Sequence, residues 1–224
     1  MATGKLYIVA TPIGNFGDIT LRALETLKSV DLVLCEDTRM TRRLLDHYAI
    51  EKPTKSYHQH STARDVKDIV AILEQGSDLA LVTDAGTPGI SDPGNLLIKA
   101  LVHSAPAIAI VPIPGPSAVI AALSISGFAT DKFVFMGFPP HKNKRQKYFK
   151  EVAIQDHTVV FYESGHRIAK CITELSEVLD PHCQIMVGRE LTKMFETIYR
   201  GNIAEIIAQK IDERGEFVVV ISQK

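Results

Sequence analysis

Residues 79–94, LALVTDAGTPGISDPG, join an apolar run to an abrupt polar turn. The run at 79–83 is short and partly β-branched, which predicts a strand buried on both faces. Residues 84–89 then mix Gly and Pro with a carboxylate, and this mixture neither continues a strand nor begins a helix favourably. In open α/β sheets, ligands bind at such turns beyond the carboxyl ends of strands. Thr-Pro-Gly and Asp-Pro-Gly also form ordinary turns, so this stretch by itself leaves a ligand role open.

Other predicted strands end in the same kind of turn. They cover residues 6–10, 31–35, 107–111, 159–162 and 185–187, and are followed by TPIGN, EDTR, PIPGPS, YESG and RELTK. Because parallel strands place their carboxyl ends at one edge of a sheet, we expect the motifs of the first half to converge in space. Such an edge offers backbone amides and a few carboxylates to a small polar ligand with a purine part and an amino-acid or phosphate part.

Predicted helices separate these strands, the first with Leu21, Leu24, Leu27 and Val30 on one face at three-residue steps. They are expected over 62–75, 95–104, 118–126, 166–179 and 203–211, with two more after the candidate N-caps Asp18 and Thr38. Residues 52–61 are expected to be irregular. Strands over 133–136 and 217–221, and an antiparallel partner over 195–199, complete the second half.

A proline-rich turn at 112–117 divides the chain. Before it, strands and helices alternate, which predicts a parallel sheet with right-handed crossovers. After it, the pattern predicts a mixed sheet. The fold class is therefore α/β, with an N-terminal domain over residues 1–114 and a C-terminal domain over residues 115–224.

The composition excludes several classes of protein. The net charge of -1 over 224 residues argues against a generally cationic nucleic-acid coat, so any RNA contact must come from local patches. Cys35, Cys171 and Cys183 show no CxxC spacing, which favours reduced thiols over disulfides or a zinc site. No apolar run approaches a membrane span, and the N-terminus lacks a secretory apolar region, so we expect a soluble, cytoplasmic protein without a membrane partner.

Familiar nucleotide and metal motifs do not match. The chain lacks GxxxxGK[ST], which excludes a P-loop, and TPIGNFG departs from the dinucleotide fingerprint GxGxxG. His58 and His60 lie one residue apart without a third ligand at a recognisable spacing, which favours a polar loop over a metal site.

Seven segments carry a resemblance to a known family. They are TPIGNFGDITLRAL, EDTRMTRRLL, VTDAGTPGISDPG, PIPGPSA, GFPPHK, FYESGHR and RELTKMFETIYRG, in this order within residues 5–221. They resemble the tetrapyrrole methylase superfamily, and more narrowly its ribosomal branch, the ribosomal RNA small subunit methyltransferase I family. The resemblance implies two α/β domains with a cofactor cleft between them, commonly in a homodimer. It also implies S-adenosylmethionine-dependent methylation of the ribose 2′-hydroxyl of a cytidine in the decoding region of 16S rRNA, within the small ribosomal subunit.

The resemblance also implies which residues contact S-adenosylmethionine. They are Pro12, Ile13, Gly14, Asp84, Ala85, Gly86, Thr87, Pro88, Ser117, Ala118, Phe161, Tyr162, Leu191 and Thr192. Ala118, Tyr162 and Leu191 are suited to frame adenine, and the Asp84 loop offers carbonyls and a carboxylate to the ammonium and sulfonium groups. Gly86 lets the backbone approach the ligand. For Pro12 and Gly14, a turn without ligand contact remains the alternative.

Methyl transfer from a sulfonium depends on in-line alignment and exclusion of water. A ribose hydroxyl is a weak acid, so a base or a cation beside the developing alkoxide would help. The candidates are Glu36, Asp37, Arg39, Glu163, Glu190 and Lys193. We favour Arg39 and Lys193 for electrostatic support and Glu190 as base, with an ion-pair network as the alternative role of these groups.

Residues 141–150 carry five fixed positive charges and no acid. This pattern is typical of a solvated helix, but beside an active site it predicts contacts with RNA phosphates, with Tyr148 or Phe149 available for stacking. The predicted RNA-binding residues are Arg39, Arg42, Arg43, Lys142, Lys144, Arg145 and Lys147. Many members of the family carry a further C-terminal domain of charged helices, whereas this chain ends at Lys224. We therefore expect RNA affinity to come from elsewhere in the chain, or from a longer natural protein.

Two other functions are compatible with these motifs. One is a methyltransferase acting on a small molecule such as a tetrapyrrole, which would not require the basic segments. The other is a non-enzymatic protein that binds a nucleotide or the ribosome, which would bind the cofactor without turnover or not at all.

Overall fold

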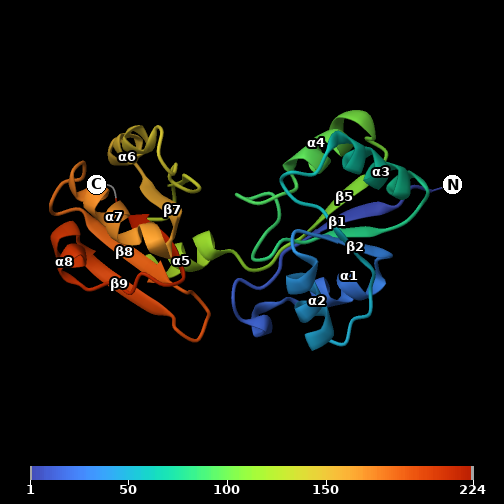
Figure 1. Ribbon diagram of the computed structural model, residues 1–224, viewed down its shortest axis with the longest axis horizontal. Helices are drawn as coiled ribbons and strands as arrows, with labels where there is room; N and C mark the ends of the chain where they lie inside the picture. Colours follow the sequence, from blue (N-terminus) through green and yellow to red (C-terminus); the bar gives the residue numbers. More distant parts are fainter. Residues whose placement is uncertain (1, 223–224) are drawn as a thin grey trace. The chain divides into compact units, whose positions relative to one another are not determined.

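The computed structural model describes residues 2–222 and contains two compact units, each with its own five-stranded sheet and hydrophobic core (Figure 1). The first unit extends to Ser117 and the second begins at Ala118. The two predicted α/β domains are confirmed. The boundary expected after residue 114 lies in the same turn, which connects β5 (Ala109–Ile113) to α5 (Ala118–Ser126).

The first sheet is parallel, with strand order β3-β2-β4-β1-β5. Besides β5, its strands are β1 (Lys5–Val9), β2 (Leu32–Cys35), β3 (Thr54–Ser56) and β4 (Leu79–Leu81). All three side chains of β4 are buried, as its apolar run predicts. The prediction of an irregular segment over 52–61 is wrong at β3. This polar edge strand, TKS, lacks an apolar run because only one neighbour, β2, pairs with it.

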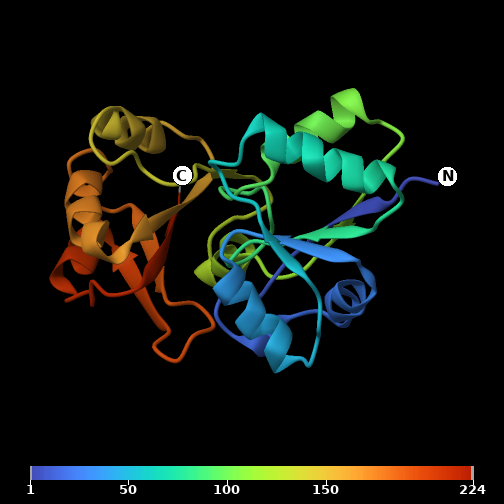
Figure 2. The ribbon, with the colours of Figure 1, turned by 45° about the vertical axis from the view of Figure 1, so that its right-hand side comes forward.

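The direction of each connection sets the sheet face that its helix covers. The connections from β1 to β2 and from β2 to β3 run toward one edge and carry α1 (Leu21–Ser29) and α2 (Thr38–His47). The connections from β3 to β4 and from β4 to β5 run the other way and carry α3 (Ala63–Glu74) and α4 (Asn95–Ser104). Right-handed crossovers in opposite directions place the two helix pairs on opposite faces (Figure 2). The neighbours β1 and β4 lead into helices on opposite faces, as β2 and β4 also do, and the position between β1 and β4 is therefore a switch point of the kind at which α/β sheets bind ligands.

Two helices begin at caps other than the predicted ones. Thr20 caps α1, since its hydroxyl accepts the Ala23 N–H at 3.1 Å, and Asp18 lies in the preceding 3-10 helix η1 (Phe16–Asp18). Asp37 caps α2, since its Oδ1 accepts the Arg39 N–H at 2.8 Å, so Thr38 is already helical. In both cases the residue that caps has extended backbone dihedrals, as a cap requires.

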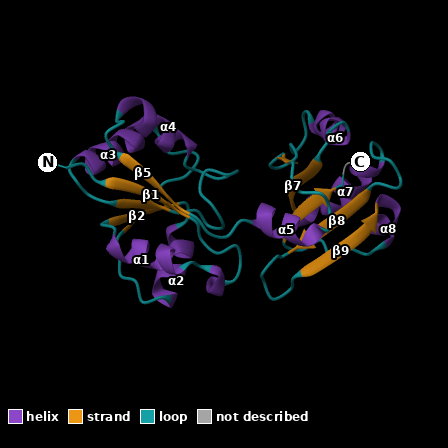
Figure 3. Ribbon diagram, turned by 180° about the vertical axis from the view of Figure 1, so that it is seen from behind, coloured by secondary structure: helices purple, strands orange, loops and turns teal. Residues whose placement is uncertain are grey.

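The second sheet is mixed, as predicted, with strand order β6-β7-β10-β8-β9. β6 (Phe133–Phe135) runs parallel to β7 (Thr158–Ser164), and the other neighbours are antiparallel: β10 (Glu216–Ile221), β8 (Gln184–Arg189) and β9 (Thr197–Asn202). Alternate residues of β7, β8 and β10 share a core with α6 (Arg145–Ala153), α7 (Gly165–Ser176) and α8 (Ile203–Ala208). Figure 3 shows these helices and the strands of the second sheet by secondary structure. α5 packs against β7 and β10. No helix within residues 2–222 is long and apolar enough to cross a membrane.

Candidate functional site

Four polar motifs of the first unit are hydrogen-bonded to one another at the carboxyl edge of its sheet. Thr11 and Gly86 form an antiparallel bridge, with N–H to C=O distances of 2.9 and 3.1 Å. The Thr87 hydroxyl donates to the Pro116 carbonyl at 3.3 Å, and the Asp37 N–H donates to Asp84 Oδ1 at 3.1 Å. The predicted convergence of TPIGN, EDTR, TDAGTPG and PIPGPS is therefore confirmed.

The loop after β4 presents bare backbone at this edge. Gly86 has a φ of 82°, a left-handed conformation that glycine adopts without strain. Pro12, Ile13, Gly86 and Pro88 are buried, whereas Gly14, Asp84 and Ala85 are exposed. Thr87 and Ser117 are half-buried. A small ligand at this edge would therefore meet Gly14, Asp84 and Ala85 first.

The carboxylates at this edge differ in acidity. Partial burial and the negative charge of Asp37 raise the pKa of Asp84, and burial together with the charge of Asp84 raises the pKa of Glu36. Hydrogen bonds from the Arg39 side chain and backbone lower the pKa of Asp37 to about 2. Arg39 itself is exposed, and its Nε and Nη2 both donate hydrogen bonds to the Asp37 carboxylate, with Nη2 at 2.7 Å from Oδ2. Its guanidinium therefore lies beside the edge with solvent-facing donors to spare.

In the second unit, the RELTK segment leaves β8 through a strained turn. Glu190 and Thr192 have φ angles of 50° and 67°. Lys193 Nζ lies 2.9 Å from Glu190 Oε1 and 2.8 Å from Glu216 Oε2, so this lysine is paired within its own unit. Burial opposes ionisation of Glu190, but the hydrogen bonds from Lys193 and from the Glu216 N–H outweigh it and lower its pKa. A carboxylate held in this way is a better anchor for Lys193 than a proton acceptor.

Two predicted site residues of β7 lie inside the second unit. Glu163, a candidate for catalysis, is 1% exposed and paired with two arginines. Phe161 is fully buried against Tyr148 and Phe149. Both side chains are buried for the same reason, because alternate residues of a central strand enter the core that α6 and α7 cover. Tyr162, between them, is half-buried, and its ring contacts Phe135 edge-to-face and Phe138 at a tilt.

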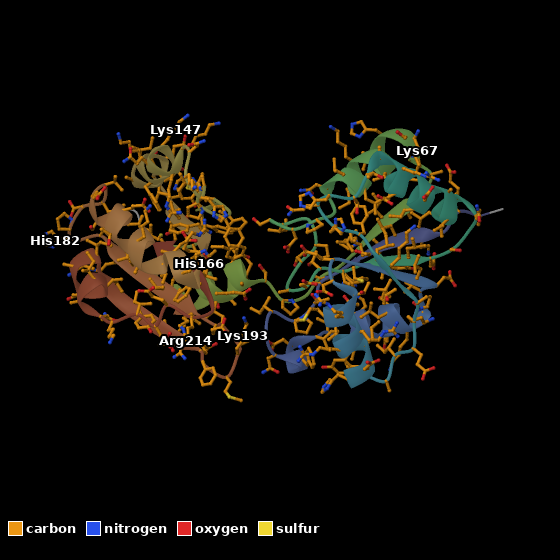
Figure 4. The ribbon with its side chains drawn as sticks, in the orientation of Figure 1. Lys67, Lys147, His166, His182, Lys193 and Arg214 are labelled. Atoms are coloured by element: carbon orange, nitrogen blue, oxygen red, sulfur yellow. The ribbon has the colours of Figure 1, made fainter. Side chains whose placement is uncertain are left out.

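The basic segment divides into buried and exposed residues. Arg145 is 4% exposed, with Nε 2.7 Å from Glu174 Oε2, and it lies over the Phe149 ring. It is therefore unavailable to RNA, and Tyr148 and Phe149 are core residues that cannot stack on bases. Lys142, Lys144 and Lys147 are exposed, and Lys147 points away from α6 (Figure 4). Arg42 and Arg43 are exposed on α2.

Comparison with known proteins places this arrangement in a family. Residues 5–207 match the family model described as Tetrapyrrole (Corrin/Porphyrin) Methylases. The chain belongs to the tetrapyrrole methylase family.

Two relatives of this tetrapyrrole methylase are named ribosomal RNA small subunit methyltransferase I. The protein from Synechocystis sp. is 46% identical over 98% of this chain and 79% of its own length. The protein from Thermotoga maritima is 40% identical over 99% of each. Among solved structures, the methyltransferase CobJ matches with a TM-score of 0.72 over 99% of this chain and 95% of its own, at 17% identity. Cobalt precorrin-4 methyltransferase, CbiF, matches with a TM-score of 0.67 over 97% and 94%, at 18% identity, so both show the shared fold.

The residues present suit S-adenosylmethionine. Among residues 2–222, three buried side-chain oxygens make no hydrogen bond, those of Thr83, Tyr148 and Thr192. Two of them belong to or adjoin segments predicted to bind the cofactor, Thr192 in RELTK and Thr83 directly before Asp84. A buried hydroxyl without a partner is costly, and each of these two hydroxyls, one in each unit, can still bond a polar ligand.

Sequence reasoning missed Thr11 and Thr83. Thr11 is 2% exposed, and its hydroxyl and backbone both bond the loop after β4. Its place directly after a predicted strand, in the first position of TPIGN, is the signal that could have marked it. Within residues 2–222, His, Cys, Asp and Glu form no group that could hold a metal ion, and His58 accepts the His60 N–H in an exposed turn.

Proposed function

We propose that this tetrapyrrole methylase transfers a methyl group from S-adenosylmethionine to the 16S RNA of the small ribosomal subunit, at the 2′-hydroxyl of a cytidine in the decoding region. The observation that carries the proposal is the hydrogen-bonded convergence of four motifs at one sheet edge, in a chain 40–46% identical to proteins named ribosomal RNA small subunit methyltransferase I. The cytidine and the position of methylation rest on the resemblance.

S-adenosylmethionine supplies an electrophilic methyl group on a sulfonium. We assign the cofactor-binding role of the first unit to the loops that the Thr11–Gly86 bridge joins. The N–H and C=O groups of these two residues bond each other, so the bridge positions the loops and does not itself bond the cofactor. The exposed Asp84 carboxylate attracts the ammonium and sulfonium charges. Thr192 offers its unpaired buried hydroxyl, and Ala118, Tyr162 and Leu191 offer apolar contact. Phe161 can contribute only through its backbone, since its side chain is fully buried.

The proton of the ribose hydroxyl leaves as the new O–C bond forms. Arg39 and Lys193 supply positive charge that would stabilise the alkoxide. Glu190 holds Lys193 at 2.9 Å, and its lowered pKa favours this orienting role over that of base. Lys142, Lys144 and Lys147, with Arg42 and Arg43, supply exposed charge for RNA phosphates. Arg145 is left out of this set because it is buried and paired.

The test is transfer of labelled methyl from S-adenosylmethionine to small ribosomal subunits that lack the modification, followed by nucleoside analysis. Label in 2′-O-methylcytidine supports the proposal in full. Label in another nucleoside of the same RNA would keep the enzyme class and overturn the position. Cofactor binding without label in RNA would overturn the substrate.

The alternative is methylation of a tetrapyrrole, which the corrin and porphyrin methylases of the same family favour. Replacing Lys142 and Lys144 by Gln separates the two, because a macrocycle does not require these charges. Transfer should fall by more than tenfold for an RNA substrate, whose binding depends on phosphate contacts, and stay unchanged for a tetrapyrrole.

Assembly and location also belong to this proposal. We expect a homodimer acting in the cytoplasm on the small subunit. Light scattering on the purified protein tests the first expectation, since a monomer mass at micromolar concentration would contradict it.

A further inference from the structure

A buried carboxylate in the second unit holds two arginines. Glu163, in β7, has no exposed side-chain area, and its Oε2 accepts from Arg145 Nη2 at 3.1 Å. Its Oε1 lies 2.7 Å from Arg167 Nη2. Glu174 Oε2 accepts a hydrogen bond from Arg145 Nε at 2.7 Å, so each of the two arginines is paired with a carboxylate. The exposed Lys170 lies 3.9 Å from Glu174 Oε1. Replacing such buried ion pairs by apolar residues is often neutral for stability, which makes stability alone a weak reason for this cluster.

Each arginine also donates to the carbonyl of one of two consecutive prolines. Arg167 Nη1 reaches the Pro139 oxygen at 3.3 Å, and Arg145 Nη1 reaches the Pro140 oxygen at 3.2 Å. The Tyr162 N–H donates to the Gly137 oxygen at 2.9 Å. Because proline has no N–H, its carbonyl is the only backbone group through which it can be hydrogen-bonded. Residues 137–140 are thus tied to β7 and the two arginines.

The exposed basic residues directly follow residues 137–140, which these hydrogen bonds hold in place. Residues 141–144, here called the basic turn, contain His141, Lys142 and Lys144, all exposed. The turn ends at Lys144 in a left-handed conformation with φ 68°, and Arg145 is the first residue of α6. The bond from Arg145 to the Pro140 carbonyl therefore closes the base of the turn, joining the residue after it to the residue before it.

We propose that Glu163 is a positioning residue which, through Arg145 and Arg167, fixes the basic turn for contact with RNA phosphates. The proposal rests on the proposed function. A turn fixed before binding loses less conformational entropy when it binds, so its two lysines contribute more affinity than they would from a mobile loop.

Charge and geometry make opposite predictions for Glu163→Gln. The substitution removes one negative charge beside the basic turn, so the net charge there becomes more positive by one unit. This change by itself strengthens binding to a polyanion. It also places an amide N–H₂ group opposite one of the two arginines. Since both groups are donors, the hydrogen bond between residue 163 and that arginine is lost. We expect the geometric effect to dominate, with Kd for small ribosomal subunits rising about tenfold, the size expected from losing about two phosphate contacts. The KM for subunits should rise by a similar factor, with kcat changed less than about twofold.

A double-mutant cycle tests whether the effect passes through the basic turn. K142Q/K144Q should weaken subunit binding about tenfold, and adding Glu163→Gln should then change Kd less than about twofold. Glu163→Gln alone and K142Q/K144Q alone should each also lower the salt dependence of subunit binding. Additive effects, or tighter binding by Glu163→Gln, would overturn the proposal. If the wild-type protein binds subunits without dependence on Lys142 and Lys144, the proposed RNA surface fails instead, which is a separate outcome.

Arg167→Lys provides a second variant in case Glu163→Gln folds poorly. It keeps the positive charge but loses the planar guanidinium, whose two terminal nitrogens bond Glu163 and the Pro139 carbonyl at the same time. Amide hydrogen exchange should accelerate about tenfold in residues 141–145 and stay unchanged in β8 and β10. Uniform acceleration across the second unit would show a general stabilising role and overturn the proposal.

Discussion

The hydroxyl of Thr11 donates a hydrogen bond to the carbonyl of Thr83 at 3.0 Å, so the loops after β1 and β4 are joined through a side chain as well as through backbone. The bond is buried and joins residues on either side of the switch point of the sheet. It fixes the start of the segment that contains Asp84 and Gly86. The geometry of the proposed cofactor edge is therefore set before any ligand arrives.

Gly86→Ala should weaken S-adenosylmethionine binding more than tenfold while destabilising the protein by only about 1–2 kcal/mol, the cost of a left-handed alanine. The added methyl lies 3.5 Å from Ile13 Cγ2 and 3.8 Å from the Pro116 oxygen, which are ordinary contacts, so the loss of binding is expected from the proposed approach of the cofactor to this backbone and not from a clash within the protein. Gly127→Ala is the matched control, with a φ of 79° and nothing within 4 Å of the added methyl. Calorimetric titration and urea unfolding measure the two effects, and equal binding by both variants would contradict the assignment.

Thr192→Val should leave the free energy of unfolding within about 1 kcal/mol of wild type, because the hydroxyl it removes has no partner. The same change should raise the Kd for S-adenosylmethionine about two- to tenfold, the worth of one hydrogen bond. Tyr148→Phe removes another unpaired buried hydroxyl and should leave cofactor binding unchanged. A normal Kd for Thr192→Val would remove this threonine from the proposed site.

Arg145→Gln should lower the free energy of unfolding by about 3–5 kcal/mol, because it removes the shared partner of the buried Glu163 and the half-buried Glu174. Lys147→Gln should change it by less than about 0.5 kcal/mol, since the Lys147–Glu151 pair is exposed. Denaturant titration compares the two neighbouring substitutions. A stable Arg145→Gln protein would mean that the cluster is not essential to the second unit.

Glu190→Gln should destabilise the protein at neutral pH by about 1–2 kcal/mol through loss of a charged hydrogen-bond acceptor. Because the pKa of Glu190 is lowered on folding, the carboxylate stabilises the folded state above its unfolded value of about 4.5. That contribution is lost as the pH falls through the lower, folded-state pKa. Urea unfolding at a series of pH values should show the two proteins converging at acid pH, and a difference that persists there would contradict the assignment.

The local sequence pattern was sufficient to predict the structure of segments whose bounds depend on residues close to them in the sequence. The helices over Asn95–Ser104 and Ala118–Ser126 have the predicted bounds, because flanking Gly and Pro residues mark their ends locally. The convergence of the first-unit motifs also followed from sequence, since parallel strands leave little choice of edge.

Prediction failed where a distant partner decides the role of a residue. Arg145 stands among exposed lysines, and only Glu163 and Glu174, 18 and 29 positions away, make it a core residue. Glu163 was taken for a reactive carboxylate for the same reason. The edge strand Thr54–Ser56 shows the converse case, because a polar sequence becomes a strand only through its pairing with β2.

The single passage of the chain between units, at Ser117 and Ala118, has a consequence for biosynthesis. Every strand described for the first sheet precedes Ser117, so no pairing in it waits for the second half of the chain. The first unit can fold during translation, roughly 5–20 seconds before the last residues are added at ordinary elongation rates. Its loops would then close around Thr11 and Gly86 while the second sheet, whose central strand β10 is the last element, is still incomplete. The connectivity therefore favours an order of assembly in which the first unit folds before the second.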